Sequence, residues 1–270
     1  MLELPQPDRD RVSTLTALVL LTYTLIRIVV LPTLDAEFAI LGLIIRFEFN
    51  TNFVMLTLAA LLATAGADWL IRSHPNFENG KSISEHWIIP GLAALGSGAI
   101  LTRIPGGPPL WIGLILTAVL LIAVLMAEYV VVDARDPRFD TASVGLSALA
   151  YLLLIGAFFA ILTADLRAAF SIPLIFIASA AVAWRLHNLN PRDRAAPQYA
   201  LLMSAITTQL AWGLHYWPLP PLRGALLLGL LVYLASGLTL MHQQGRLERS
   251  RVWEFAAVFT VAIVLIFSLT

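Results

Sequence analysis

Stretches of about 20 apolar residues recur along this chain, and each is long enough to cross the hydrocarbon core of a bilayer as a helix. With 59% hydrophobic residues, 13% charged residues and a mean hydropathy of +0.83, the 270-residue chain carries more apolar surface than one aqueous core could bury. Backbone polar groups in hydrocarbon need partners within the chain, and the sequence lacks the alternation of a membrane barrel. We therefore expect an all-α, polytopic transmembrane helical bundle in a single integral membrane domain, residues 1–270.

Nine segments meet this length criterion. The apolar stretch within residues 36–47 is too short to span, and we expect it to lie at the membrane interface or to re-enter the membrane. The nine expected spans lie near residues 12–31, 52–71, 87–103, 110–132, 142–163, 168–185, 197–216, 222–241 and 252–270.

Basic residues are distributed unevenly between alternate ends of these spans. The N-terminus and the even connections hold Arg9, Arg11, Arg72, Lys81, Arg135, Arg138, Arg185, Arg192, Arg194, Arg246, Arg249 and Arg251, whereas the odd connections hold Arg46, Arg103, Arg167 and Arg223. Positive charge stays on the cytoplasmic side of a membrane. The asymmetry of twelve against four predicts a cytoplasmic N-terminus and a C-terminus outside.

The composition also limits the partners. The formal net charge is zero and Lys81 is the one lysine, so no basic patch indicates nucleic acid. The chain has no cysteine, which excludes disulfides and thiolate metal sites. We expect the partners to be membrane lipids and other membrane proteins.

Three stretches resemble the landmarks of a known family. They read "GADWLIRSHP" (residues 66–75), "AEYVVVDARDPRFD" (127–140) and "YWPLPPLRGALLLGLLVYLASGL" (216–238). They look like those of a family of uncharacterised polytopic membrane proteins from bacteria, a domain of unknown function. The resemblance implies a multi-pass protein of the bacterial cytoplasmic (inner) membrane, and it supplies no activity, cofactor or catalytic residue.

Charged residues near the membrane are the first candidates for function. Asp68, Arg72, His74 and Glu128 gather at the expected cytoplasmic ends and are the candidate catalytic residues. Asp68 and Arg72 are four residues apart on one helical face, so they are expected to form an ion pair. In the alternative interpretation, "DWLIRSHP" is only a helix exit with an interfacial tryptophan and a proline that ends the helix.

A second group of carboxylates suggests a metal site. Asp133, Asp136 and Asp140 form a D-x-x-D-x-x-x-D pattern, and closely spaced carboxylates can hold Mg²⁺ that grips a diphosphate. The pattern is similar to the first aspartate motif of UbiA-type intramembrane prenyltransferases. It follows the fourth span here rather than the second, and Asp193 stands alone where a second motif would be expected. In the alternative interpretation the motif is a solvated turn, whose carboxylates contribute little to folding.

Two further features lie elsewhere in the spans. Arg27 is expected either to extend to the outer headgroups or to pair with Glu48. One span has a conspicuous polar group at its centre, made of Thr207, Thr208 and Gln209. This group gives little indication of a transport path.

We favour a non-catalytic membrane protein of unknown function that acts through lipid or protein partners. The alternative is a membrane enzyme acting on a lipid-soluble or prenyl diphosphate substrate at the cytoplasmic interface, and a second alternative is a small-solute transporter. No cofactor is expected, except Mg²⁺ under the enzyme alternative.

Overall fold

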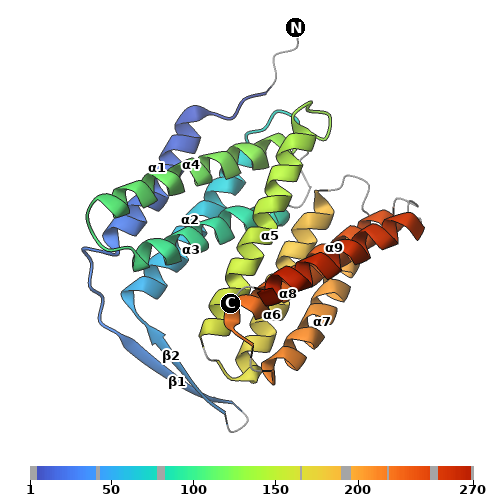
Figure 1. Cartoon of the computed structure of the whole chain (residues 1–270). Helices are drawn as coiled ribbons and strands as arrows, with labels where there is room; N and C mark the ends of the chain where they lie inside the picture. Colours follow the sequence, from blue (N-terminus) through green and yellow to red (C-terminus); the bar gives the residue numbers. More distant parts are fainter. Residues whose placement is uncertain are drawn as a thin grey trace. The chain divides into compact units, whose positions relative to one another are not determined.

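The computed structural model describes residues 5–40, 43–77, 83–164, 166–189, 196–217, 219–243 and 249–268. These ranges contain nine α-helices, one short 3-10 helix and one β-hairpin (Figure 1). The chain divides into two compact units, Met1–Ala142 and Ser143–Thr270. The helices are α1 (Arg9–Leu25), α2 (Thr51–Ile71), α3 (Ile88–Arg103), α4 (Pro108–Val130), α5 (Phe139–Thr163), α6 (Ala168–Asn188), α7 (Ala196–His215), α8 (Pro221–Gln243) and α9 (Arg249–Ser268), and the 3-10 helix η1 covers Ser84–Trp87.

Each of the nine apolar segments overlaps one of these helices. Five helices, α2, α4, α5, α6 and α8, are long and apolar enough to cross a membrane. The protein is therefore a helical, membrane-embedded protein. The largest difference from the expected boundaries is in α1, which ends at Leu25 although its span was expected to reach residue 31. The β-branched run Ile28–Val30 and Pro32 disfavour helix there, which explains the early end.

The all-α expectation omitted a β-hairpin. Strand β1 (Leu34–Ile40) pairs antiparallel with β2 (Leu43–Phe49), and the register joins Leu34 to Phe49 and Ile40 to Leu43. The sequence "IRFEF" alternates apolar and charged residues with the period of two that strands require. The segment 36–47 is thus part of a hairpin, and its position at or in a membrane stays a prediction.

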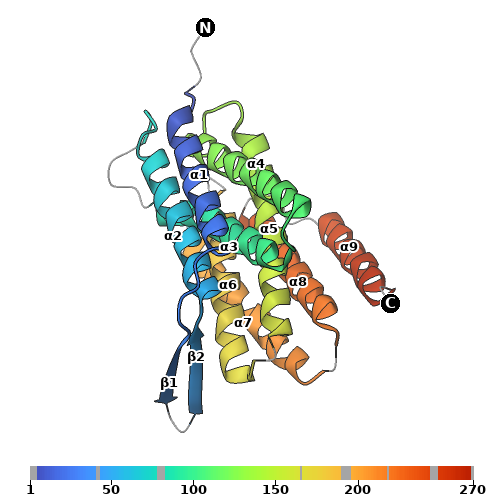
Figure 2. The same ribbon diagram turned by 90° about the vertical axis from the view of Figure 1, so that its left-hand side faces the viewer.

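In the first unit, α2 packs against α1 and α3, and both of these also pack against α4 (Figure 2). Close approach of α1 and α2 depends on Gly66, because a Cβ built there would lie 2.4 Å from a Leu15 methyl group. The buried core between α1, α2 and α4 consists of Val12, Leu15, Ala67, Leu70, Leu125 and Tyr129.

In the second unit, α6, α7 and α8 pack against one another, and α9 packs against α8. Side chains of α5 reach α8. The hydroxyls of Tyr151 and Ser236 are 2.7 Å apart, and the rings of Tyr151 and Tyr233 meet edge to face at 5.5 Å. The second unit therefore buries neutral hydroxyl groups among apolar helix faces.

Candidate functional site

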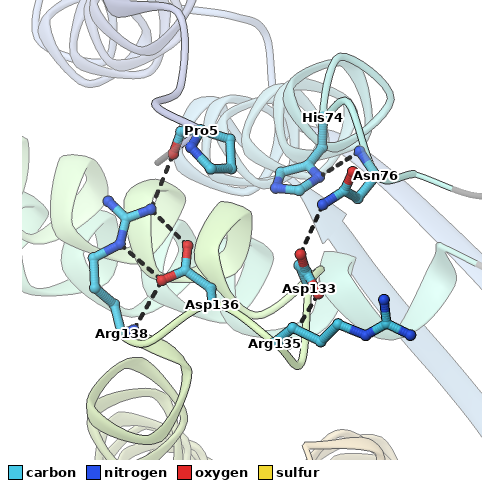
Figure 3. A network of polar contacts seen from close by, with 7 residues as sticks. All are labelled: Pro5, His74, Asn76, Asp133, Arg135, Asp136 and Arg138. Atoms are coloured by element: carbon cyan, nitrogen blue, oxygen red, sulfur yellow. Dashed lines mark hydrogen bonds and ion pairs between the residues drawn. The ribbon is translucent and has the colours of Figure 1, made fainter. Parts of the chain in front are cut away.

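A polar network lies at one end of the first unit (Figure 3). Its side chains come from the segment after α2 and from the turn between α4 and α5, and the segment before α1 adds the backbone carbonyl of Pro5. They include three of the residues singled out in the sequence, namely His74, Asp133 and Asp136. The residues drawn in Figure 3 are Pro5, His74, Asn76, Asp133, Arg135, Asp136 and Arg138.

Asp136 and Arg138 form the tightest contact of the network. Oδ1 of Asp136 accepts hydrogen bonds from the backbone N–H (2.8 Å) and Nε (3.0 Å) of Arg138, and Oδ2 accepts one from Nη2 (2.7 Å). Nη2 also donates to the carbonyl of Pro5 at 2.9 Å. The guanidinium group lowers the pKa of Asp136 and has its own pKa raised in return. The pair thereby ties the segment before α1 to the α4–α5 turn.

Asp133 makes a second tie, between the α4–α5 turn and the segment after α2. Its Oδ2 accepts from the side-chain amide of Asn76 at 2.7 Å, and its Oδ1 accepts from the backbone N–H of Arg135 at 2.9 Å. The backbone N–H of Arg135 and the amide of Asn76 together lower the pKa of Asp133. Bonds from a side-chain oxygen to the N–H two residues on are typical of Asx-turns, so both aspartates also shape the turn.

His74 is the least satisfied member of the network. The ring is only 3% exposed and packs on Tyr129, with ring centroids 4.5 Å apart. Nδ1 accepts from the backbone N–H of Asn76 at 3.1 Å, so a neutral ring carries its proton on Nε2. Among the described residues, that buried Nε2 has no hydrogen-bond partner. In Figure 3 the ring edge opposite Asn76 faces the side where Pro5 and the Asp136–Arg138 pair lie.

Burial decides the charge of His74. Desolvation lowers its pKa, and this effect exceeds the opposite influence of Asp133 and Asp136, while Arg138 adds to the lowering. His74 is therefore neutral at pH 7, and its Nε2–H is a buried donor without an acceptor in the part of the chain that the structure describes. A group of this kind can donate to an incoming oxygen atom.

The expected pair of Asp68 and Arg72 is confirmed. Nε of Arg72 lies 2.7 Å from Oδ2 of Asp68, and Nη2 lies 3.3 Å from Oδ1. The indole N–H of Trp87 also donates to Oδ1, at 3.3 Å. The Arg72 side chain is 59% exposed, so the pair belongs to the surface. Beside it, Arg11 lies over the ring of Trp69 at 4.6 Å.

Glu128, the fourth candidate, is fully buried in α4. Its Oε2 lies 2.7 Å from Nδ1 of His86, which comes from η1. Sequence reasoning did not identify His86 as its partner, because the two residues are 42 positions apart and the loop before η1 carries no periodic pattern that would predict the contact. A buried carboxylate needs such a partner.

The three proposed metal ligands are not gathered into one cluster. Asp140 lies exposed in the first turn of α5, while both oxygens of Asp133 and of Asp136 accept the hydrogen bonds described above. In the described parts of the chain, no group of three His, Cys, Asp or Glu residues could hold a metal ion. The expectation that these carboxylates are solvated was wrong for Asp136, which is 7% exposed because the turn folds over it.

The second unit holds a polar cluster that the sequence did not reveal. His187 stacks on Tyr199, with ring centroids 5.6 Å apart, and its nitrogens lie 2.9 Å from the Ala183 carbonyl and 3.2 Å from the Thr239 hydroxyl. Arg185, two residues earlier, is 1% exposed. His187, Tyr199 and Thr239 come from α6, α7 and α8, so only the packing of these helices shows that they form a cluster.

Five helices are apolar and long enough to cross a membrane, and polar clusters are buried near the helix ends. The protein therefore belongs to the class of helical membrane proteins. The chain belongs to the family described as "Protein of unknown function (DUF5656)", whose model matches residues 31–269. The uncharacterised family expected from the three sequence landmarks is thus confirmed. No curated protein and no solved structure matches the chain.

Proposed function

We propose that this protein acts without catalysis, through contacts with membrane lipids or with other membrane proteins. The observation that supports this function best is the occupation of the conspicuous carboxylates. Each oxygen of Asp133 and Asp136 already accepts a hydrogen bond: the bond from Asn76 joins the segment after α2 to the α4–α5 turn, and the bonds from Arg135 and Arg138 hold the turn itself. Such a network stabilises a fold, whereas a catalytic or metal centre needs free ligand positions.

The enzyme alternative requires Asp133, Asp136 and Asp140 to bind Mg²⁺ and a prenyl diphosphate. Asp136 would first have to release Arg138, which holds it by three hydrogen bonds. Releasing a buried ion pair is costly because it leaves a charge without its partner. This cost favours the non-catalytic function.

Thermal unfolding of the purified protein distinguishes the two functions. A ligand that binds only the folded state raises the unfolding midpoint. We expect Mg²⁺ and farnesyl diphosphate added together to shift the unfolding midpoint no further than either one does alone. An additional upward shift that needs both would contradict the proposal and favour the prenyl diphosphate enzyme.

Transport has less support. The hydroxyls of Thr207 and Thr208 donate to carbonyls of their own helix, those of Met203 and Ser204. These two hydroxyls are therefore hydrogen-bonded within α7. Small-solute transport therefore rests on the composition of α7 alone.

For topology, we propose nine spans in a bacterial cytoplasmic membrane, with the N-terminus in the cytoplasm. Support comes from the excess of basic residues at alternate ends of the spans. A reporter that is active only outside the cytoplasm should be active when fused after Thr270 and silent within residues 190–195. The reverse pattern would contradict the nine-span topology.

A further inference from the structure

A cavity of about 110 Å³ lies at the end of α1, far along that helix from the polar network. Its wall comes from the end of α1, the last turns of α3 and the first turns of α4. Apolar side chains dominate it, including Ile26, Leu101, Leu110 and Leu114. A cavity of this lining accepts hydrocarbon rather than a water-soluble solute.

The polar groups in the wall are mostly satisfied inside the protein. The hydroxyl of Tyr23 donates to the carbonyl of Ala94 at 2.6 Å. The hydroxyls of Thr24 and Thr102 donate to carbonyls of their own helices. These residues therefore present mainly carbon to the cavity.

Arg27 is the exception, and it is the one charged side chain among the described residues of the wall. It reaches the end of α3, where its Nη2 donates to the carbonyls of Leu101 (2.8 Å) and Ile104 (2.6 Å). The expected pairing with Glu48 falls on a side chain outside the described residues. Both bonds of Arg27 come from one nitrogen, so among the described residues Nη1 and Nε have no acceptor and can bind one from outside the protein.

The described groups around Arg27 balance its charge only in part. The carbonyl end of a helix carries about half a negative charge, so α3 compensates part of the guanidinium. A phosphate group would compensate the rest, because guanidinium nitrogens match phosphate oxygens in pairs. In a membrane, the molecules that combine a phosphate with hydrocarbon are the phospholipids. Trp111, 66% exposed beside the cavity, belongs to the residue type that marks the headgroup level.

We propose that this cavity is a binding site for an anionic phospholipid. Arg27 holds the phosphate through Nη1 and Nε, and part of an acyl chain fills the space between α1, α3 and α4. A net negative headgroup is preferred over a zwitterionic one, because a headgroup cation would repel Arg27. The inference rests on the proposed function and names the lipid class with which this protein works.

Lipid-dependent thermal unfolding of the full chain in detergent tests the site. Dioleoyl phosphatidylglycerol should raise the unfolding midpoint more than dioleoyl phosphatidylcholine does. Arg27→Gln should raise the phosphatidylglycerol concentration needed for half of the shift by about tenfold, the loss expected for one charged hydrogen-bonding group.

Arg103→Gln is the matched control. It removes one positive charge from the same end of α3, and Arg103 does not line the cavity. It should leave the phosphatidylglycerol shift nearly as in the native protein. Thr102→Phe should fill the cavity and abolish the preference for phosphatidylglycerol while Arg27 stays in place, which keeps the test decisive if Arg27→Gln does not fold.

Two results would overturn the site: equal stabilisation by the two lipids, or the same weakening in Arg27→Gln and Arg103→Gln. Neither bears on whether the protein is an enzyme, because an enzyme would show a shift that needs Mg²⁺ and the lipid shift does not. A magnesium-dependent shift with the lipid site intact would overturn the non-catalytic function alone.

Discussion

The ends of α2 and α6 carry the same short pattern and use it in opposite ways. Both ends read Arg-x-His, as Arg72–His74 and Arg185–His187. Each helix is also the first of three that pack on one another: α2 with α3 and α4, and α6 with α7 and α8. At α2 the arginine is exposed, and the histidine is buried with one nitrogen that has no partner among the residues described. At α6 the arginine is buried and both histidine nitrogens have partners.

The difference follows from where each helix ends. Pro75 stops α2 before His74 can take a helical position, so its Nδ1 faces the backbone N–H of Asn76. α6 continues through Asn188, so His187 reaches the carbonyl of Ala183 one turn earlier. The polar end of the first unit thus contains the ion pair of Asp136 and Arg138, and the partners of His187 in the second unit are a backbone carbonyl and a hydroxyl group.

The largest expected effect separates the two arginines. Arg185→Ala should lower the free energy of unfolding by about 3 kcal/mol, because it removes a fully buried charged group and the contacts that satisfy it. Arg72→Ala should cause a much smaller loss, since water already solvates that side chain. Unfolding of both variants in the same detergent measures the difference. Similar losses of unfolding free energy in the two variants would mean that the difference in burial between Arg185 and Arg72 has no effect on stability.

The next effect compares an ion pair with a neutral hydrogen bond. Asp136→Asn should cost about 2 kcal/mol, below the range of fully buried pairs because Arg138 still contacts water. In the second unit, Thr239→Val keeps the side-chain shape and removes the hydroxyl that meets His187, which should cost about 1 kcal/mol. If Thr239→Val lowers the free energy of unfolding more than Asp136→Asn does, the ion pair is not the main stabilising contact at the polar end of the first unit.

A smaller effect concerns pH. Burial lowers the pKa of His74 below its usual value of 6.5, so the unfolded chain binds a proton more readily than the folded protein. The contribution of His74 to the free energy of unfolding is therefore fully present above pH 6.5, and it is lost as the pH falls through the lowered pKa. The slope is at most about 1.4 kcal/mol per pH unit.

The matched variants are His74→Gln and His187→Gln, each measured by unfolding across this pH interval. His74→Gln should flatten the slope, whereas His187→Gln should retain it. Asp133 and Asp136 do not obscure the result, because their lowered pKa values place their titration below 3.8. A slope that persists in His74→Gln would show that another group carries it.

The smallest effect is the coupling between Asp68 and Arg72. Asp68→Asn should lower stability slightly, and adding Arg72→Gln should restore part of the loss, because the second change removes the unpaired charge. A double-mutant cycle measures the coupling. Strict additivity would mean that the pair seen at 2.7 Å contributes nothing.

Local patterns predicted what depends on neighbouring residues. The apolar segments predicted the nine helices, and the four-residue spacing predicted the pair of Asp68 and Arg72. The hairpin of β1 and β2 was missed although the period-two alternation of "IRFEF" was present, because its short length suggested only an interfacial piece. Burial of Asp136 was missed because a turn rich in charges has the composition of a solvated loop.

The sequence by itself determined the membrane class and the helices, because hydrophobic length and helical spacing act between residues close together in the chain. Only the tertiary structure decided which polar atoms are satisfied. Glu128 meets His86 across 42 positions, Arg27 meets the end of α3 across 74, and Nε2 of His74 meets no partner within the described ranges. The physical reason is that a hydrogen bond depends on distance and direction between atoms, which the packing of helices sets and the order of residues does not.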